Sequence, residues 1–257
     1  MAARAVWKGH LAIDGLNCPV ALHTAISASA RLHFHIINRK TGHRVTRAYV
    51  DSATGDAVES SGLMRGFDTG KGDFILLSQD DIAAAAPESD KRLEVKSFIP
   101  CDEIDRLYFE RPYYLTPSTP ADAELFVEIR DGLRAKQAAA VAQAVLFKRL
   151  RAVLIRAHGR GMIATLLNFD YEVRSPDQAF ADIPDLEIKG EMLDLAQEII
   201  KRMKGSFDPA SFTDRYEEAM AALIRAKAEG KEIKPIKRKK VEKTSDLLEA
   251  LRKSAAA

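Results

Sequence analysis

Over most of the chain, hydrophobic residues recur in short runs or at every second position, which is the spacing of β-strands. Leu32, Phe34 and Ile36, for example, alternate with His33 and His35 ahead of a polar loop. The pattern predicts strands over residues 11–13, 20–22, 32–37, 44–50, 74–77, 93–99, 107–115, 152–155 and 162–167.

Turn-forming residues connect several of these strands. Asp14-Gly15, residues 38–42 and His158–Gly161 predict hairpin loops. Residues 57–73 are rich in glycine and predict irregular structure, whereas Phe74–Leu77 is wholly apolar and predicts a short buried strand.

Helical patterns are fewer and lie mostly toward the C-terminus. The clearest start is at Thr119, an N-cap residue followed by Pro120 at the first helical position and by Asp122 three residues after the cap. That helix is expected to run past Leu133 into the alanines beyond it. Further helices are predicted after Asp80, over residues 192–203 and 216–230, and over 246–253 behind Ser245.

These changes in pattern divide the chain into three expected parts: a β-rich part over residues 1–185, a helical part over 186–230 and a tail over 231–257. Residues 231–243 hold seven lysines or arginines against two acids, and Pro235 prevents a continuous helix. The tail is therefore expected to be a flexible basic linker.

Charge is informative only locally, because the formal net charge of the 257 residues is +2. Residues 31–72 contain seven lysines or arginines against four acids, with few aromatic residues. Such a segment suits an arm that follows a nucleic-acid backbone better than a surface that stacks bases. On charge alone, an ordinary solvated surface is the simpler explanation.

Catalytic motifs are absent or incomplete. Gly66–Gly72 resembles a phosphate loop, but its glycine spacing and its last residue are wrong for one. His33 and His35 would share one face of a strand, and with His43 nearby they offer the alternative of a metal-dependent nuclease or hydrolase, although a metal site needs more ligands. We expect no enzymatic activity, no cofactor and no metal.

Two features bear on the compartment. Cys18 and Cys101 are the only cysteines, their spacing does not suggest a zinc site, and both are expected to be reduced thiols. No stretch approaches the roughly 20 apolar residues that span a bilayer. A cytoplasmic protein without a membrane partner is expected.

Many short motifs follow one another along about residues 4–231. They are Trp7-Lys8-Gly9, Pro19-Val20 with Leu22, Leu63–Phe67, Phe74–Leu77 with Asp80-Asp81, Ile104-Asp105, Tyr108-Phe109, Pro112–Leu115 with Pro117, Glu172–Arg174, Tyr216, Ala226-Lys227 and Glu229–Lys231. In order and spacing these motifs resemble those of the bacterial Ku family. The departures are Ala12–Gly15 and Ala21, which stands where lysine is common in the family, so any DNA contact of that lysine is absent here.

The resemblance implies a mixed, mainly β fold: a β-barrel core, an extended strand-rich bridge over about residues 28–78, and a C-terminal helical arm over 186–230. Two copies would form a ring-shaped homodimer. The implied function is sequence-independent binding of double-stranded DNA ends in non-homologous end joining, a form of DNA repair and recombination, on the nucleoid. The implied partner is an ATP-dependent DNA ligase, recruited through the C-terminal region, with Leu247, Leu248 and Leu251 as possible contacts.

The resemblance and the local charge together nominate site residues. The apolar residues expected to cross the dimer interface are Leu195, Ile199, Leu223 and Ile224. A β-rich RNA-binding or scaffold protein is a third alternative. The residues expected to contact DNA phosphates are Lys8, Arg31, Arg39, Lys40, Arg44, Arg47 and Arg65, with Lys237, Arg238, Lys239, Lys240 and Lys243 in the tail.

Overall fold

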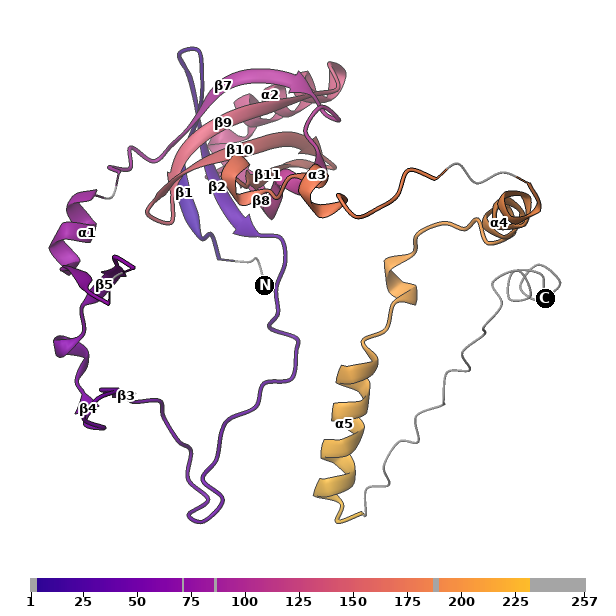
Figure 1. The fold of residues 1–257 in the computed structure, drawn as a ribbon. Coiled ribbons are helices and arrows are strands. Elements are labelled where there is room, and N and C mark those ends of the chain that lie inside the picture. The colour runs from indigo at the N-terminus through magenta and orange to yellow at the C-terminus, as the bar shows by residue number, and fades with distance from the viewer. Residues whose placement is uncertain (1–3, 71, 86, 187–189, 232–257) are drawn as a thin grey trace. The chain divides into compact units, whose positions relative to one another are not determined.

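The computed structural model describes residues 4–70, 72–85, 87–186 and 190–231 (Figure 1). Contacts divide the chain into two units, one of residues 1–29 and 35–175 and the other of residues 30–34 and 176–257. Within the described residues, no helix combines the length and the apolar character that crossing a membrane requires.

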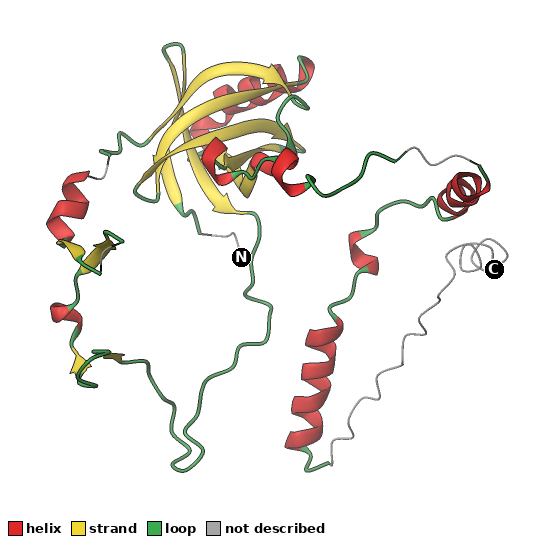
Figure 2. Cartoon of the chain, in the orientation of Figure 1, coloured by secondary structure: helices red, strands yellow, loops and turns green. Residues whose placement is uncertain are grey.

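The first unit contains a closed barrel of seven strands, drawn in yellow in Figure 2. Its order is β1-β2-β8-β11-β10-β9-β7. Six neighbouring pairs are antiparallel, and a ring with an odd number of strands must then contain one parallel pair, here β1 with β7. The strands are β1 (Trp7–Ile13), β2 (Leu16–Thr24), β7 (Arg92–Pro100), β8 (Phe109–Pro117), β9 (Ala138–Leu146), β10 (Arg149–His158) and β11 (Gly161–Leu167).

The hydrophobic core is the inside of this barrel. Alternate residues of each strand point inward, so that Leu11, Leu22, Leu115 and Ile155 are almost completely buried. The expected mainly β fold with a barrel core is thus confirmed.

One glycine in the wall of the barrel has no space for a side chain. A β-carbon on Gly9 would collide with the carbonyl oxygen of Lys91 and with the indole of Trp7. Only glycine lets β1 approach the start of β7 this closely. The β1–β7 pair is the seam that closes the barrel.

Helix α2 (Ala123–Ala135) packs against the barrel and adds Phe126 and Leu133 to the same core. Its start is as expected: Thr119 and Asp122 form a capping box over the short 3₁₀ turn η3 (Pro120–Asp122).

The predicted extension of this helix into the following alanines is wrong. The helix ends at Ala135, Gln137 takes a left-handed conformation with φ of 50°, and the alanines form β9. Ala140, Ala142 and Ala144 are buried in the barrel core and Ala139 in a second cluster with Leu154 and Leu167, because β9 is paired on both sides, with β7 and β10. Tertiary packing overrides the high helix propensity of alanine.

Between β2 and β7 the chain makes a long excursion outside the barrel, residues 25–91. It includes the expected bridge of about residues 28–78, and from here on the whole excursion is called the bridge. Nearly all of its described side chains are exposed. It carries a β3–β4 hairpin, a β5–β6 hairpin and one short helix. Its elements are β3 (Tyr49–Val50), β4 (Ala57–Val58), η1 (Ser60–Gly62), β5 (Arg65–Asp68), β6 (Phe74–Leu77) and α1 (Gln79–Ala85).

Three expectations for the bridge are corrected. No strand forms over residues 32–37, where a single bridge pair, Ile37 with Arg44, flanks the predicted turn. Residues 65–68 form β5, where irregular structure was expected. Phe74–Leu77 is a strand as predicted, but it is exposed rather than buried, since β5 is its single partner among the described strands.

Two further short 3₁₀ helices of the first unit lie next to barrel strands. They are η2 (Arg106–Tyr108) before β8 and η4 (Asp170–Glu172) after β11. Phe169 and Tyr171, around the start of η4, stack with their ring centroids 5.4 Å apart.

The described elements of the second unit are all helical, and the two longest lie where the pattern predicted helices over residues 192–203 and 216–230. Its elements are α3 (Pro176–Ala179), α4 (Glu191–Arg202), η5 (Pro209–Ser211) and α5 (Arg215–Ala228). Asp214 caps α5 by accepting hydrogen bonds from the backbone N–H groups of Tyr216 and Glu217. The carboxylate of Glu217 in turn accepts a hydrogen bond from the Leu32 backbone N–H, at 3.1 and 3.3 Å to its two oxygens. Residues 30–34 therefore pack with α5.

Candidate nucleic-acid interface

Two of the predicted DNA-binding residues, Arg39 and Lys40, lie in the tight turn near the middle of the bridge. The Asn38 N–H donates to the His43 carbonyl at 2.8 Å, and the Asn38 side chain accepts from the Lys40 backbone N–H at 2.9 Å. Gly42 completes the turn with φ of 71°. The turn leaves both side chains exposed.

The other predicted bridge cations are spread over several elements. Arg44 lies opposite Ile37 beside this turn, and Arg65 lies on β5 opposite Leu77. Arg47 lies between the turn and β3 and, like the others, is exposed. Arg31 belongs to the second unit and is also exposed.

The basic side chains described in the bridge have no ion-pair partner among the residues that the structure describes, whereas two of its acidic side chains accept hydrogen bonds from the backbone of their own turns. Arg31, Arg39, Lys40, Arg44, Arg47 and Arg65 form no ion pair with any residue that the structure describes. Asp51 instead accepts hydrogen bonds from the backbone of Ala53 and Thr54, which lower the pKa of its carboxyl, and Asp68 accepts one from Gly70. These acids are held in turns, while the cations remain available to an external anion.

On the barrel, Lys8 projects from β1 opposite Ala21 of β2 and is exposed. Leu22, which follows Ala21 in β2, is buried in the barrel core. Because successive residues of a strand point to opposite faces, Ala21 and its partner Lys8 point to the outer face. The structure thus gives Lys8 a position on the barrel surface that a charged ligand can reach.

The sequence missed a cationic hairpin tip between β9 and β10. Phe147 and Lys148 both adopt positive φ, 54° and 68°, in a two-residue turn closed by Leu146 and Arg149. Phe147 is half exposed and stacks on Tyr113 at 5.9 Å. Asn-Gly usually marks such turns, and Phe-Lys does not, so no sequence signal identified it. Strained backbone that presents an aromatic ring and two cations is a candidate contact.

The alternative metal site loses its structural basis. His33 and His35 lie in a segment that forms no strand, so the strand face predicted to carry both of them does not form. Among the described residues, no group of three or more histidine, cysteine or acidic side chains is arranged to hold a metal ion.

The predicted dimer residues lie on the two long helices of the second unit. Leu195 and Ile199 of α4 and Leu223 of α5 are partly exposed, and Ile224 is 43% exposed. None of the described side chains of these helices is buried within the single chain. The predicted tail contacts, Lys237, Arg238, Lys239, Lys240 and Lys243, lie outside the described residues.

Comparison with known proteins agrees with this geometry. The model of the Ku70/Ku80 beta-barrel domain family matches residues 12–195. A non-homologous end joining protein Ku of Cereibacter sphaeroides is 51% identical over 257 residues, covering 99% of this chain and 96% of the relative. Relatives of the same name in Bradyrhizobium sp. and Methylocella silvestris are 36% and 32% identical, covering 99% of this chain and 87% and 96% of their own lengths. The closed barrel, the family match and these relatives together show that the chain belongs to the Ku family.

Proposed function

We propose that this protein binds the ends of double-stranded DNA in non-homologous end joining, without reading the base sequence. The observation that carries the proposal is the set of exposed bridge cations that lack an ion-pair partner in the described part of the chain. Phosphate oxygens supply the missing partners and carry no sequence information, so a broken end of any sequence can be bound. The role is binding rather than catalysis.

The proposed assembly is a homodimer whose two bridges close a ring around the duplex. Support comes from the apolar residues of β5 and β6, since Phe67, Phe74, Ile75 and Leu76 are each more than half exposed in the single chain. Exposed apolar patches of this kind mark surfaces that a partner covers. The half-exposed apolar residues of α4 and α5 support the same conclusion for the helical arm, because a two-fold interface uses the same surface of both copies.

Binding of a linear duplex across a salt series tests the phosphate contacts. The logarithm of the association constant should fall linearly with the logarithm of salt concentration, by about 0.9 for each phosphate neutralised. Arg39→Gln combined with Lys40→Gln should lower that slope by about 2 and weaken all sequences equally. Lys96→Gln, which removes a cation paired with Glu94 at 2.8 Å, is the matched control and should change little.

Encirclement is tested separately, by comparing a linear duplex with a closed circle of the same sequence. A ring loads only from an end, so the circle should not bind. Equal binding to both would refute the ring, and a salt-independent affinity would refute the phosphate contacts.

A ligase is the proposed downstream partner, with recruitment assigned to the residues after Gly230. The basic residues of that region, Lys237 to Lys243, would add non-specific attraction to DNA. Truncation after Gly230 should reduce stimulation of an ATP-dependent DNA ligase more than it reduces end binding. The opposite ranking would assign the tail to DNA instead.

A further inference from the structure

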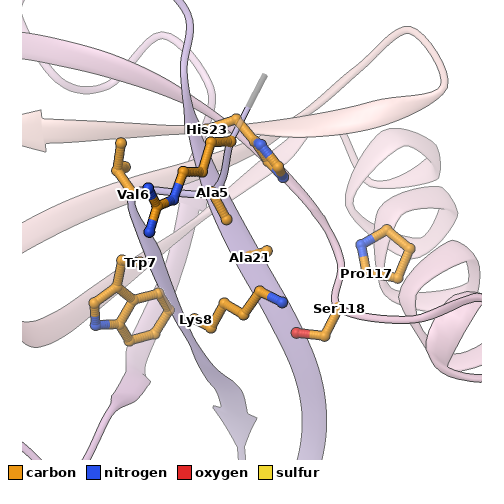
Figure 3. A pocket seen from close by; sticks show the side chains of 9 residues that line it. Ala5, Val6, Trp7, Lys8, Ala21, His23, Pro117 and Ser118 are labelled. Atoms are coloured by element: carbon orange, nitrogen blue, oxygen red, sulfur yellow. The ribbon is translucent and has the colours of Figure 1, made fainter. Parts of the chain in front are cut away.

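A pocket of about 580 Å³ lies on the outer face of the barrel, where β1, β2 and the end of β8 meet (Figure 3). Lys8 extends across Ala21 toward Ser118, and His23 lies further along β2 than Ala21. Arg4 lines the pocket as well. All of these residues belong to one unit, so the pocket is part of the barrel itself.

The lining is basic without a compensating acid. It contains an arginine, a lysine and a histidine and no aspartate or glutamate, although the whole chain has 39 lysines and arginines against 37 acids. Neither Arg4 nor Lys8 forms an ion pair with any described residue. The charge of this site is therefore left for an anion from outside.

The other side chains of the lining are held in place by the barrel. The Ser118 N–H donates to the Pro19 carbonyl at 3.0 Å, which fixes the position of the serine at the pocket's edge. The His23 Nε2 lies 3.2 Å from the Thr116 hydroxyl oxygen, across the β2–β8 pair. Ala21, which is 3% exposed, has too small a side chain to fill the space between Lys8 and Ser118. A hydroxyl and two full cations around one concave space are groups that bind phosphate oxygens.

We propose that this pocket binds a phosphate group of the DNA. The inference deepens the proposed function and rests on it, since the end-bound duplex is the source of the phosphate. That phosphate is either the terminal 5′-phosphate or an internal phosphodiester, and both present the same oxygens to Arg4, Lys8 and Ser118.

The pocket contains its own reporter, because Trp7 lines it and is the only tryptophan in the chain. The full-length protein is titrated with inorganic phosphate replacing chloride at constant ionic strength, and Trp7 fluorescence is recorded. The emission should change and saturate. Lys8→Gln should weaken the apparent phosphate affinity about tenfold, as expected for the loss of a charged hydrogen bond. Lys96→Gln should leave it unchanged, and an unaltered melting temperature shows that Lys8→Gln still folds.

The source of the phosphate is resolved with two linear duplexes that differ only in a 5′-phosphate or a 5′-hydroxyl. If the terminal phosphate is bound, the phosphorylated duplex binds more tightly and Lys8→Gln abolishes the difference. If an internal phosphodiester is bound, the two duplexes bind equally and Lys8→Gln weakens both.

Two results overturn the inference and leave end binding standing: a phosphate titration that does not saturate, or duplex affinities that Lys8→Gln and Arg4→Gln do not alter. Failure of the wild-type protein to bind any linear duplex would instead overturn the proposed function. A saturable phosphate titration distinguishes that case, because it reports the pocket without DNA.

Discussion

Gly9 and Gly132 are both glycines inside regular elements, but their surroundings predict opposite effects of the same substitution. A β-carbon on Gly9 meets the Lys91 backbone and the Trp7 ring, whereas a β-carbon on Gly132, in α2, meets nothing within 4 Å. Gly9→Ala should lower the free energy of unfolding by about 1–3 kcal/mol, the usual cost of overpacking. Gly132→Ala should raise it by up to about 1 kcal/mol through helix propensity. Urea unfolding of the two variants checks this, and a shift of the same sign in both would contradict it.

The two cysteines should react at very different rates. Cys18 is completely buried in the barrel, and burial raises the pKa of its thiol to about 11, while Cys101 is exposed. Because the thiolate is the reactive form, Cys18 is protonated and shielded at neutral pH. A thiol reagent should titrate one group rapidly in the native protein and two after denaturation. Cys101→Ser should remove the rapid reaction, and a rapid reaction that survives this change would show Cys18 to be accessible.

At this scale the sequence identified which residues carry charge but not what surrounds them. The bridge arginines were found from their local excess over acids, yet their lack of ion-pair partners among the described residues emerges only in three dimensions. Arg4, His23 and Ser118 are far apart in the sequence and meet only because β1, β2 and β8 are neighbours.

At the scale of elements, the β9–β10 turn combines strain with an exposed charge. Lys148 has φ of 68°, a conformation that glycine adopts without steric cost. Lys148→Gly should therefore raise the free energy of unfolding by about 0.5–1 kcal/mol, the left-handed penalty less the entropy cost of glycine. If the hairpin tip contacts DNA, the same variant should also weaken binding of a linear duplex.

The measurements are chemical denaturation and DNA binding on the same preparations. Lys148→Asn is the matched control, since asparagine tolerates the left-handed region but also removes the charge. A gain in stability without any loss of DNA binding would remove this turn from the interface.

Elements with strong local signals were predicted well, and those decided by packing were not. The Thr119 cap and the Asp14-Gly15 and Gly159 turns depend on neighbouring residues, so the sequence is sufficient for them. The alanines of β9 are helix formers that become a strand because they pair with both β7 and β10. The segment 32–37 has the alternation of a strand, but among the described residues it has a single bridge partner instead of a ladder.

At the scale of the whole molecule, the bridge presents more apolar surface than a monomer would be expected to leave uncovered. Phe67 and Ile75 face each other across the β5–β6 hairpin and are 65% and 55% exposed. Replacing both with serine should weaken the proposed self-association, because in the proposed dimer these apolar side chains lie between the two copies. It should leave the barrel's melting temperature nearly unchanged, since neither residue belongs to the barrel core.

Sedimentation velocity and thermal unfolding test this pair of expectations. Phe126→Ala, in the barrel core, is the converse control and should lower the stability of the barrel by about 3–5 kcal/mol. If the double serine substitution does not weaken the dimer, the interface is assigned to the helices of the second unit instead.

The parallel seam between β1 and β7 also has a consequence for synthesis on the ribosome. The seam joins three residue pairs, from His10 with Arg92 to Ala12 with Glu94. The two strands of the seam are therefore about 80 residues apart in the sequence, and β7 is synthesised well after β1. Until the bridge has emerged, the β1–β2 hairpin has both of its edges unpaired, a state that invites wrong pairing with other chains. Barrel closure should therefore be a late and slow event that follows translation of β7 to β11, and the nascent chain is most exposed to aggregation while the bridge is being made.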